Sequence, residues 1–190
     1  PYLKEYGYTH IVSGFPALSN SGQSLILKSK QGSIISTVTY HDSWYKNSLK
    51  SEGGWSLEQI DPENPCGGEY NWTASANSDG GTPGKENSVL ASNPDLAAPE
   101  LIRATVINNT NIRLYFNETI DSISATNLSN YLVDNEIGSP DSITLVSPDY
   151  LSLILTFNQP FTENIIYTIE ILSGITDCSG NEIGEFNTVR

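Results

Sequence analysis

Two segments in the last third of the sequence have an apolar residue at every second position. They are residues 151–157 and 165–171, with leucine, isoleucine and aromatic residues at the alternating positions. Successive side chains of a β-strand point to opposite faces, so each segment would present one continuous apolar face. Both segments are therefore predicted to be core strands of a β-sheet.

Shorter segments of strand-forming residues recur along the sequence between turn-forming residues. In the second half these predicted strands are 101–107, 112–117, 131–133 and 142–146, and in the first half they are 8–12, 24–28, 34–40 and 55–60. The sequence has 10 Tyr, 5 Phe and 3 Trp but no Met, which favours strands over helices. We expect an all-β protein, and the short strands of the second half predict an immunoglobulin-like sandwich.

The two halves of the sequence differ in charge and in glycine content. Residues 1–90 contain six basic and nine acidic residues and eleven of the fifteen Gly, whereas residues 91–190 contain three basic and thirteen acidic residues. The segment from Asn87 to Pro99 has two prolines and no strand periodicity, as expected of a linker. We predict a first domain at 1–90, a linker at 91–98 and a second domain at 99–190.

The predicted strands of the first domain are too few to close a sandwich. Because unpaired strand edges are costly and sticky, we expect that opening strands precede residue 1 in a longer parent protein, or that the second domain covers the gap. The sequence begins with Pro1 and not with Met, as an internal fragment would. The first domain is therefore expected to be a sandwich that lacks its opening strands.

The charge of the sequence excludes several classes of partner. The net charge is −13 with only nine Lys and Arg, so the basic surface that nucleic acid requires is missing. The same argument disfavours anionic membrane surfaces, and no apolar run approaches the roughly 18 residues of a spanning helix. We expect neither nucleic-acid binding nor direct insertion into a membrane.

Several motifs of the first domain together resemble the bacterial type of lamin tail domain. They lie in residues 40–45, 53–62, 71–72 and 80–88, and the resemblance covers roughly residues 8–88. It implies an immunoglobulin-like sandwich in which the motif with Trp55, Leu57 and Glu58 forms a late strand. The closing motif of that family corresponds here to Gly81, Thr82, Pro83 and Gly84, followed by Asn87. The opening strands of the family have no counterpart in this sequence.

Motifs of the second domain resemble the bacterial immunoglobulin-like repeats that accompany lamin tail domains in secreted multidomain proteins of Bacteroidetes. These motifs are residues 116–121, 130–131 and 177–181. In such proteins the repeats serve as spacers, as adhesion surfaces or as accessories beside hydrolases. The resemblance therefore implies an exported or cell-surface location, with neighbouring domains of the parent chain as partners.

Catalytic groups are scarce in the sequence. The only histidines are His10 and His41, and His41, Asp42 and Ser43 are consecutive. Neighbours on an extended segment point to opposite faces, so these three cannot align as a hydrolytic triad, although an arrangement through His10 stays open. We expect a non-catalytic protein without a cofactor.

Two polar motifs carry alternative interpretations. Asp177, Asn181 and Glu182 surround the turn at Gly180 and offer the oxygen ligands that calcium prefers, but Asp and Asn are also common in such turns for conformational reasons. Ser122 and Ser142 each stand in an Asp-Ser-aliphatic pattern that looks like the acceptor of O-glycans in exported Bacteroidetes proteins, or each is an ordinary polar turn residue.

The cysteines and tryptophans give two further hypotheses. Cys66 and Cys178 lie one in each predicted domain and would form a disulfide between the domains in an oxidising compartment, or each could pair elsewhere or stay reduced. Trp44 and Trp72 would stack on sugar rings if exposed, but core roles are the alternative.

We therefore expect a structural or adhesive module of an exported or cell-surface multidomain protein, with a protein or a glycan at the cell surface as its partner. The alternative is an accessory glycan-binding module attached to a secreted hydrolase.

Overall fold

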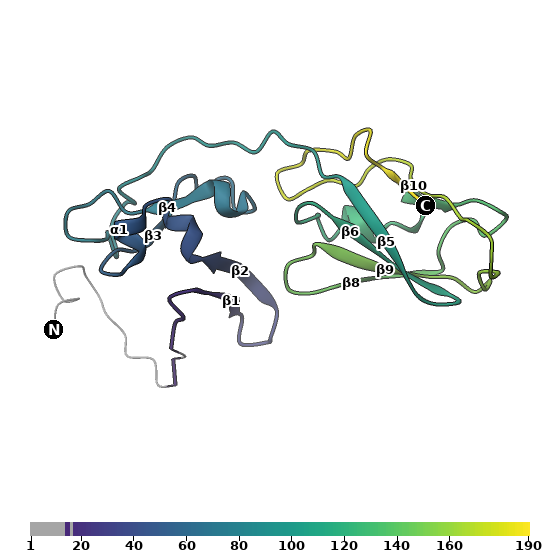
Figure 1. The fold of residues 1–190 in the computed structure, drawn as a ribbon, viewed down its shortest axis with the longest axis horizontal. Helices are drawn as coiled ribbons and strands as arrows, with labels where there is room; N and C mark the ends of the chain where they lie inside the picture. The colour runs from purple at the N-terminus through teal and green to yellow at the C-terminus, as the bar shows by residue number, and fades with distance from the viewer. Residues whose placement is uncertain (1–13, 16) are drawn as a thin grey trace. The chain divides into compact units, whose positions relative to one another are not determined.

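The computed structural model describes residues 14, 15 and 17–190, and the chain divides into two compact units, Pro1–Pro94 and Asp95–Arg190. Each unit is described by itself. Both consist of β-strands joined by long loops with only short helical turns, which confirms the all-β prediction (Figure 1). The predicted strand at 8–12 lies outside the described residues.

The described residues of unit 1 form two small antiparallel sheets. In the first, β1 (Gly22–Lys28) pairs with β2 (Ile34–His41), and in the second, β3 (Leu57–Gln59) pairs with β4 (Trp72–Ala74). Short helical turns connect them, and they are η2 (Asp42–Tyr45), α1 (Ser48–Ser51) and η3 (Gly68–Asn71). The predicted strands at 24–28, 34–40 and 55–60 correspond to β1, β2 and β3, whereas β4 was not predicted.

Among the described residues of unit 1, buried polar side chains hold the loops together, and the buried apolar residues are few. Asn71 is fully buried, and its amide donates to the backbone carbonyl of Asp61 while its carbonyl accepts from the Asp61 N–H. Asp61 also accepts a hydrogen bond from the backbone N–H of Asn93 at 2.7 Å. Residues near the end of this unit are therefore fixed to its loops by satisfied buried hydrogen bonds.

Unit 2 is a sandwich of two antiparallel sheets. The larger sheet has the order β5-β6-β9-β8 and the smaller one the order β11-β10-β7. The strands are β5 (Leu101–Asn108), β6 (Asn111–Phe116), β7 (Tyr131–Val133), β8 (Ser142–Leu145), β9 (Ser152–Thr156), β10 (Ile169–Ile171) and β11 (Thr188–Val189). Short turns η4 (Ser124–Thr126) and η5 (Leu128–Asn130) precede β7.

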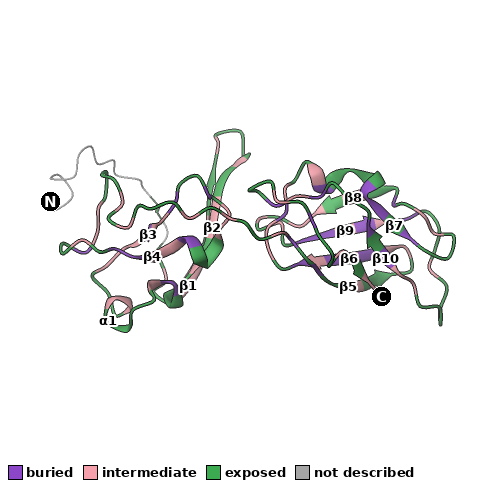
Figure 2. Ribbon diagram, turned by 90° about the horizontal axis from the view of Figure 1, so that it is seen from above, coloured by how far each residue is buried: buried purple, intermediate pink, exposed green. Residues whose placement is uncertain are grey.

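The core of unit 2 lies between these two sheets, and both contribute buried residues to it. Buried residues are purple in Figure 2. The larger sheet contributes alternate residues of β6 and β9, and the smaller sheet contributes residues of β7 and β10. The main core residues are Ile112, Leu114, Phe116, Leu153, Leu155, Tyr131, Val133, Ile169 and Ile171. Burial of this apolar surface is the main contribution to the stability of unit 2. The buried Tyr131 hydroxyl has a hydrogen-bond partner, because it donates to the backbone carbonyl of Ala125 at 2.7 Å.

The prediction for 165–171 was wrong in its first half. Only residues 169–171 pair as a strand, and Ile165 and Ile166 are 46% and 77% exposed. Asn164 just before them has φ of 65°, a left-handed conformation that ends an extended segment. The pairing at the end of the chain was not predicted either: the Leu101 N–H, at the start of β5, donates to the carbonyl of Phe186 at 2.7 Å, just before β11.

Candidate functional site

The two motifs of unit 1 meet at the buried carboxylate of Glu58 in β3, which is 4% exposed. Its Oε1 accepts a hydrogen bond from the Thr82 hydroxyl at 2.6 Å. Its Oε2 accepts from the backbone N–H and the hydroxyl of Ser88 at 2.8 and 2.7 Å. Asn87 donates its side-chain amide to the carbonyl of Gln59 at 3.0 Å. Glu58 and Asn87 thus fasten the loop 81–88 to β3.

The environment of Glu58 keeps its carboxylate ionised. Burial alone would raise its pKa, but the hydrogen bonds from Thr82 and Ser88 lower that pKa below its usual value. A carboxylate whose oxygens already accept three hydrogen bonds is a poor proton donor or acceptor for a reaction. The geometry therefore supports a structural role for this group.

Glycines allow the loop with the closing motif to approach the segment just before β3. A Cβ on Gly81 would lie 2.8 Å from Ser56 Oγ, and a Cβ on Gly80, where φ is +87°, would clash with the carbonyl oxygen of Gly54. Beside the loop lies a hollow of about 720 Å³, lined by residues 54–58, 79–85 and Asn87, which include Trp55, Leu57, Pro83 and Gly84. The motif residues share one region of unit 1.

The tryptophans do not form a stacking platform on the surface. Trp44 is 8% exposed, and its ring lies 6.3 Å from that of the half-buried Trp72. The Trp55 ring is covered on one face by Lys50, whose Nζ is 4.2 Å from the ring centroid. Trp44 has no face to offer to a sugar, so for this residue the glycan-stacking interpretation is wrong. Tyr40, Tyr45, Trp55 and Trp72 line a smaller hollow of about 410 Å³.

The residues His41, Asp42 and Ser43 do not form a catalytic arrangement. All three are exposed at the end of β2 and the start of η2. Within the described part of the chain, His41 makes no hydrogen bond to either neighbour. The other histidine, His10, lies outside the described residues.

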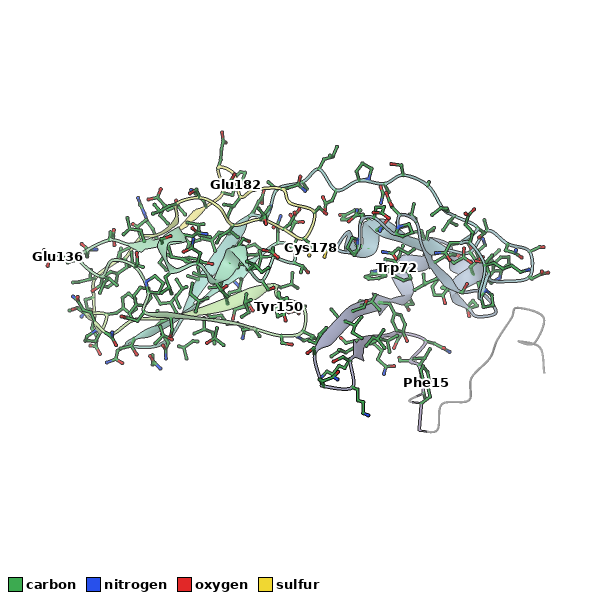
Figure 3. All side chains as sticks on the ribbon, turned by 180° about the vertical axis from the view of Figure 1, so that it is seen from behind. Phe15, Trp72, Glu136, Tyr150, Cys178 and Glu182 are labelled. Atoms are coloured by element: carbon green, nitrogen blue, oxygen red, sulfur yellow. The ribbon has the colours of Figure 1, made fainter. Side chains whose placement is uncertain are left out.

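The calcium candidates Asp177, Asn181 and Glu182 all accept or donate hydrogen bonds in the loops of unit 2. Asp177 is 2% exposed, and its carboxylate accepts from the backbone N–H groups of Ser179 and Asn181 and from the Asn181 amide, each at 2.8 Å. Glu182, which is labelled in Figure 3, accepts a hydrogen bond from the Gly174 N–H, and the two atoms are 2.8 Å apart. The turn interpretation therefore describes Asp177 and Asn181, and the calcium site of Asp177, Asn181 and Glu182 stays a prediction.

Asp177 also lies beside Asp95 and Glu118, and one carboxylate oxygen from each of these three residues lies within 4.8 Å of the other two. This group joins three distant parts of the sequence, so no local motif predicts it. Burial, together with the charges of Asp95 and Asp177, raises the pKa of Glu118 to about 7. Three such oxygens are the ligand type that a hard cation such as calcium takes.

The remaining candidates stay predictions. Ser122 and Ser142 are both exposed, as an O-glycan acceptor has to be. Cys66 belongs to unit 1 and Cys178 to unit 2, and the proposed pairing between them remains open to a test. None of the helices in the described residues has the length and hydropathy of a segment that crosses a bilayer.

One cluster of unit 2 was missed entirely by the sequence reasoning. Arg103 in β5 and Arg113 in β6 both place their guanidinium groups over the ring of Tyr115, at 3.9 and 4.9 Å from its centroid. The period-2 pattern of β6 places Arg113 and Tyr115 on the face opposite the core, but their meeting with Arg103 requires the β5–β6 register.

Residues 87–189 match the model of the bacterial Ig-like domain family. The chain belongs to this family. The family match confirms the immunoglobulin-like part of the sequence interpretation, and it covers unit 2 together with the last residues of unit 1.

Solved structures similar to this bacterial Ig-like chain include the S-layer protein SbsC. A longer segment of SbsC is 23% identical with a TM-score of 0.43, covering 48% of this chain and 13% of that chain. The N-terminal part of SbsC is 21% identical with a TM-score of 0.43, covering 48% of this chain and 22% of that chain. This chain thus spans less than a quarter of these proteins, and no curated protein matches it.

Proposed function

We propose that this chain is a non-catalytic structural or adhesive module of an exported or cell-surface multidomain protein. The observation that carries the proposal is membership of the bacterial Ig-like family, together with a sandwich whose core receives side chains from both sheets. A compact domain with its own core would serve to separate or present the neighbouring domains of its parent chain. Its parent chain would supply the further domains.

The use of carboxylates supports a structural role. Asp121 accepts from the backbone N–H groups of Ile123 and Ser124, and Asp134 accepts from the Thr168 N–H at 2.9 Å. Asp141 binds the backbone N–H and the side-chain amide of Asn158, each at 2.6 Å. These acidic groups hold loops in place, as the side chains of Asp commonly do in turns.

We further propose that unit 1 is a lamin-tail-like module. The support is that the two motifs of the resemblance are in contact: Glu58 of one binds Thr82 of the other, and Asn87 binds the backbone of β3. A closing loop fastened to a late strand is what the resemblance implies. The alternative of an accessory glycan-binding module keeps one supporting feature in unit 1, the aromatic hollow lined by Tyr40, Tyr45, Trp55 and Trp72.

The proposal is tested with a panel of esterase, phosphatase, nuclease and glycosidase substrates. We expect no turnover of any substrate by the purified chain. Turnover that co-purifies with the chain and disappears in His41→Ala would overturn the non-catalytic assignment, provided that circular dichroism shows the variant to be folded.

A further inference from the structure

The outer face of the larger sheet in unit 2 carries no acidic residue at its paired positions. Because Ile112, Leu114 and Phe116 of β6 are buried, the residues between them face away from the core. The register of the four strands places the following residues on that outer face: Arg103, Thr105, Asn111, Arg113, Tyr115, Ser142, Thr144, Ser152, Ile154 and Thr156. Unit 2 contains thirteen Asp and Glu and only three Arg, and two of those Arg lie here.

These two arginines have no acidic partner among the described residues. Arg103 is exposed, its guanidinium lies 3.9 Å from the ring centroid of Tyr115, and that guanidinium makes no hydrogen bond to a described residue. Arg113 contacts the same ring at 4.9 Å and donates through Nε and Nη2 to the hydroxyl of Ser152 at 3.2 and 2.8 Å. In a chain of net charge −13, guanidinium groups without carboxylate partners are notable, because surface arginines readily pair with carboxylates.

Stacking on Tyr115 prepares these groups to bind an anion. When a guanidinium stacks on an aromatic ring, the N–H groups at its edge still point away from the ring. Two of these N–H groups can donate side by side to the two oxygens of a carboxylate. The ring also limits the rotamers of both side chains, so less conformational entropy is lost when a ligand binds. The Thr105 hydroxyl, 3.5 Å from the Tyr115 hydroxyl, and then the two arginines lower the pKa of Tyr115.

The surroundings of the arginine pair indicate the type of anion. Hydroxyl groups of Thr105, Thr144 and Thr156 lie on the same face and complement the hydroxyl groups of sugars. The excess of negative charge in unit 2 repels a dense polyanion such as nucleic acid strongly, whereas it repels a glycan with widely separated carboxylates much less, because that glycan has fewer charges per unit length. The guanidinium groups of Arg103 and Arg113, on a sheet face rich in hydroxyl groups, therefore fit a glycan with separated carboxylates better than they fit nucleic acid.

We propose that the outer face of the β5-β6-β9-β8 sheet, whose strands are labelled in Figure 1, binds a glycan that carries isolated carboxylate groups, such as a chain with uronic acid residues. The binding groups are Arg103 and Arg113, which stack on Tyr115. The inference rests on the adhesive side of the proposed function and names the class of its partner.

The probe for the test is a hyaluronan oligosaccharide, in which a carboxylate occurs on every second sugar. Binding is measured by isothermal titration calorimetry at low ionic strength with EDTA present, so that metal ions cannot bridge the partners. The matched control ligand is the same oligosaccharide with its carboxylates reduced to alcohols. We expect binding of the first ligand and none of the second, and the affinity should fall as salt is added.

Variants of the chain assign the binding to this face. Arg103→Ala should weaken binding roughly 10- to 100-fold, the loss expected for a hydrogen-bonded ion pair, and Arg103→Lys should recover only part of it. Arg190→Ala removes the same charge outside the face and should leave binding unchanged. Tyr115→Phe keeps the ring and should bind like the original chain, whereas Tyr115→Leu should bind more weakly. Thermal unfolding of each variant verifies the fold.

Three results with the hyaluronan ligands would overturn the inference. They are absence of hyaluronan binding by the original chain, equal binding of the carboxyl-reduced ligand, and full binding by Arg103→Ala. Equal or tighter binding of poly-glutamate would also overturn it, because the partner would then be an acidic peptide. Failure here leaves the structural role of the module standing, whereas failure of the proposed function would appear separately as turnover in the substrate panel.

Discussion

The buried carboxylate of Glu58 offers the sharpest test of how unit 1 is held together. In Glu58→Gln, the side chain keeps its shape and the acceptor for the Thr82 hydroxyl, but an NH₂ group replaces the oxygen that accepts both hydrogen bonds of Ser88. Hydrogen bonds to a charged group contribute about 1.5–3 kcal/mol each. Ser88 is exposed, so water recovers part of this loss. We expect the free energy of unfolding of unit 1 to fall by about 2–3 kcal/mol.

Tryptophan fluorescence reports this change for unit 1 alone, because all three tryptophans lie in residues 1–94. Urea unfolding curves of the original chain and of Glu58→Gln are compared at pH 7, with Glu86→Gln as control, since Glu86 is an exposed carboxylate of the same unit. A loss below about 0.5 kcal/mol, the usual effect of a surface substitution, would refute the reasoning.

The same pair of curves has a predicted pH dependence. Since the folded-state pKa of Glu58 is lowered, its contribution is complete above the unfolded-state carboxyl value of about 4.3 and is lost as the pH falls through the folded-state pKa. The difference between the original chain and Glu58→Gln should therefore shrink at acidic pH. A difference that stays constant would show that the charge of Glu58 does not matter.

Three further predictions follow from other parts of the chain. The pKa of Glu118 is raised to about 7, so the folded state binds more protons than the unfolded state between about pH 4.5 and 7, and unit 2 should lose stability as the pH rises through that range. Glu118→Gln should abolish this loss in urea unfolding followed by circular dichroism, and an unchanged pH dependence of the unfolding free energy would contradict the prediction. Trp44→Ala should lower the stability of unit 1 by about 3–5 kcal/mol in the same measurement, because it empties a buried site, and a loss under about 1 kcal/mol would count against that burial. Chymotrypsin should cut the chain first after Leu96, which is 84% exposed. If Cys66 pairs with Cys178, the two fragments should stay joined on a non-reducing gel and separate on a reducing gel, and separation without reductant would reject the disulfide.

Local patterns in the sequence predict individual strands of unit 2 well but not all of their limits. Leu153, Leu155 and Phe157 are buried as their alternation predicts, because β9 lies in the interior of its sheet. Ile165 has the same alternation yet is 46% exposed, because only residues 169–171 have partner strands. Periodicity reports the face that a strand would present, whereas pairing decides whether the strand forms.

The candidate sites depend on contacts between distant residues, and this limits what the sequence alone predicts. The resemblance places Glu58 and Thr82 in two motifs, but the hydrogen bonds of Glu58 to Ser88 follow only from the fold of the loop. Arg103 and Tyr115 become neighbours through the β5–β6 register, which a bulge between Leu101 and Arg103 shifts. A one-residue slip would place them on opposite faces, and composition cannot distinguish these cases.

The junction between Leu101 and Phe186 determines how unit 2 would respond to mechanical load. The first strand of the unit is hydrogen-bonded to the segment just before the last strand, and β11 contacts β5. Tension applied to the two ends of the unit therefore reaches this junction before it reaches the core. The resistance of unit 2 to extension is set by the rate at which these few hydrogen bonds between β5 and the end of the chain open under force. Substitutions at this junction would therefore alter that resistance even where they leave the free energy of unfolding almost unchanged.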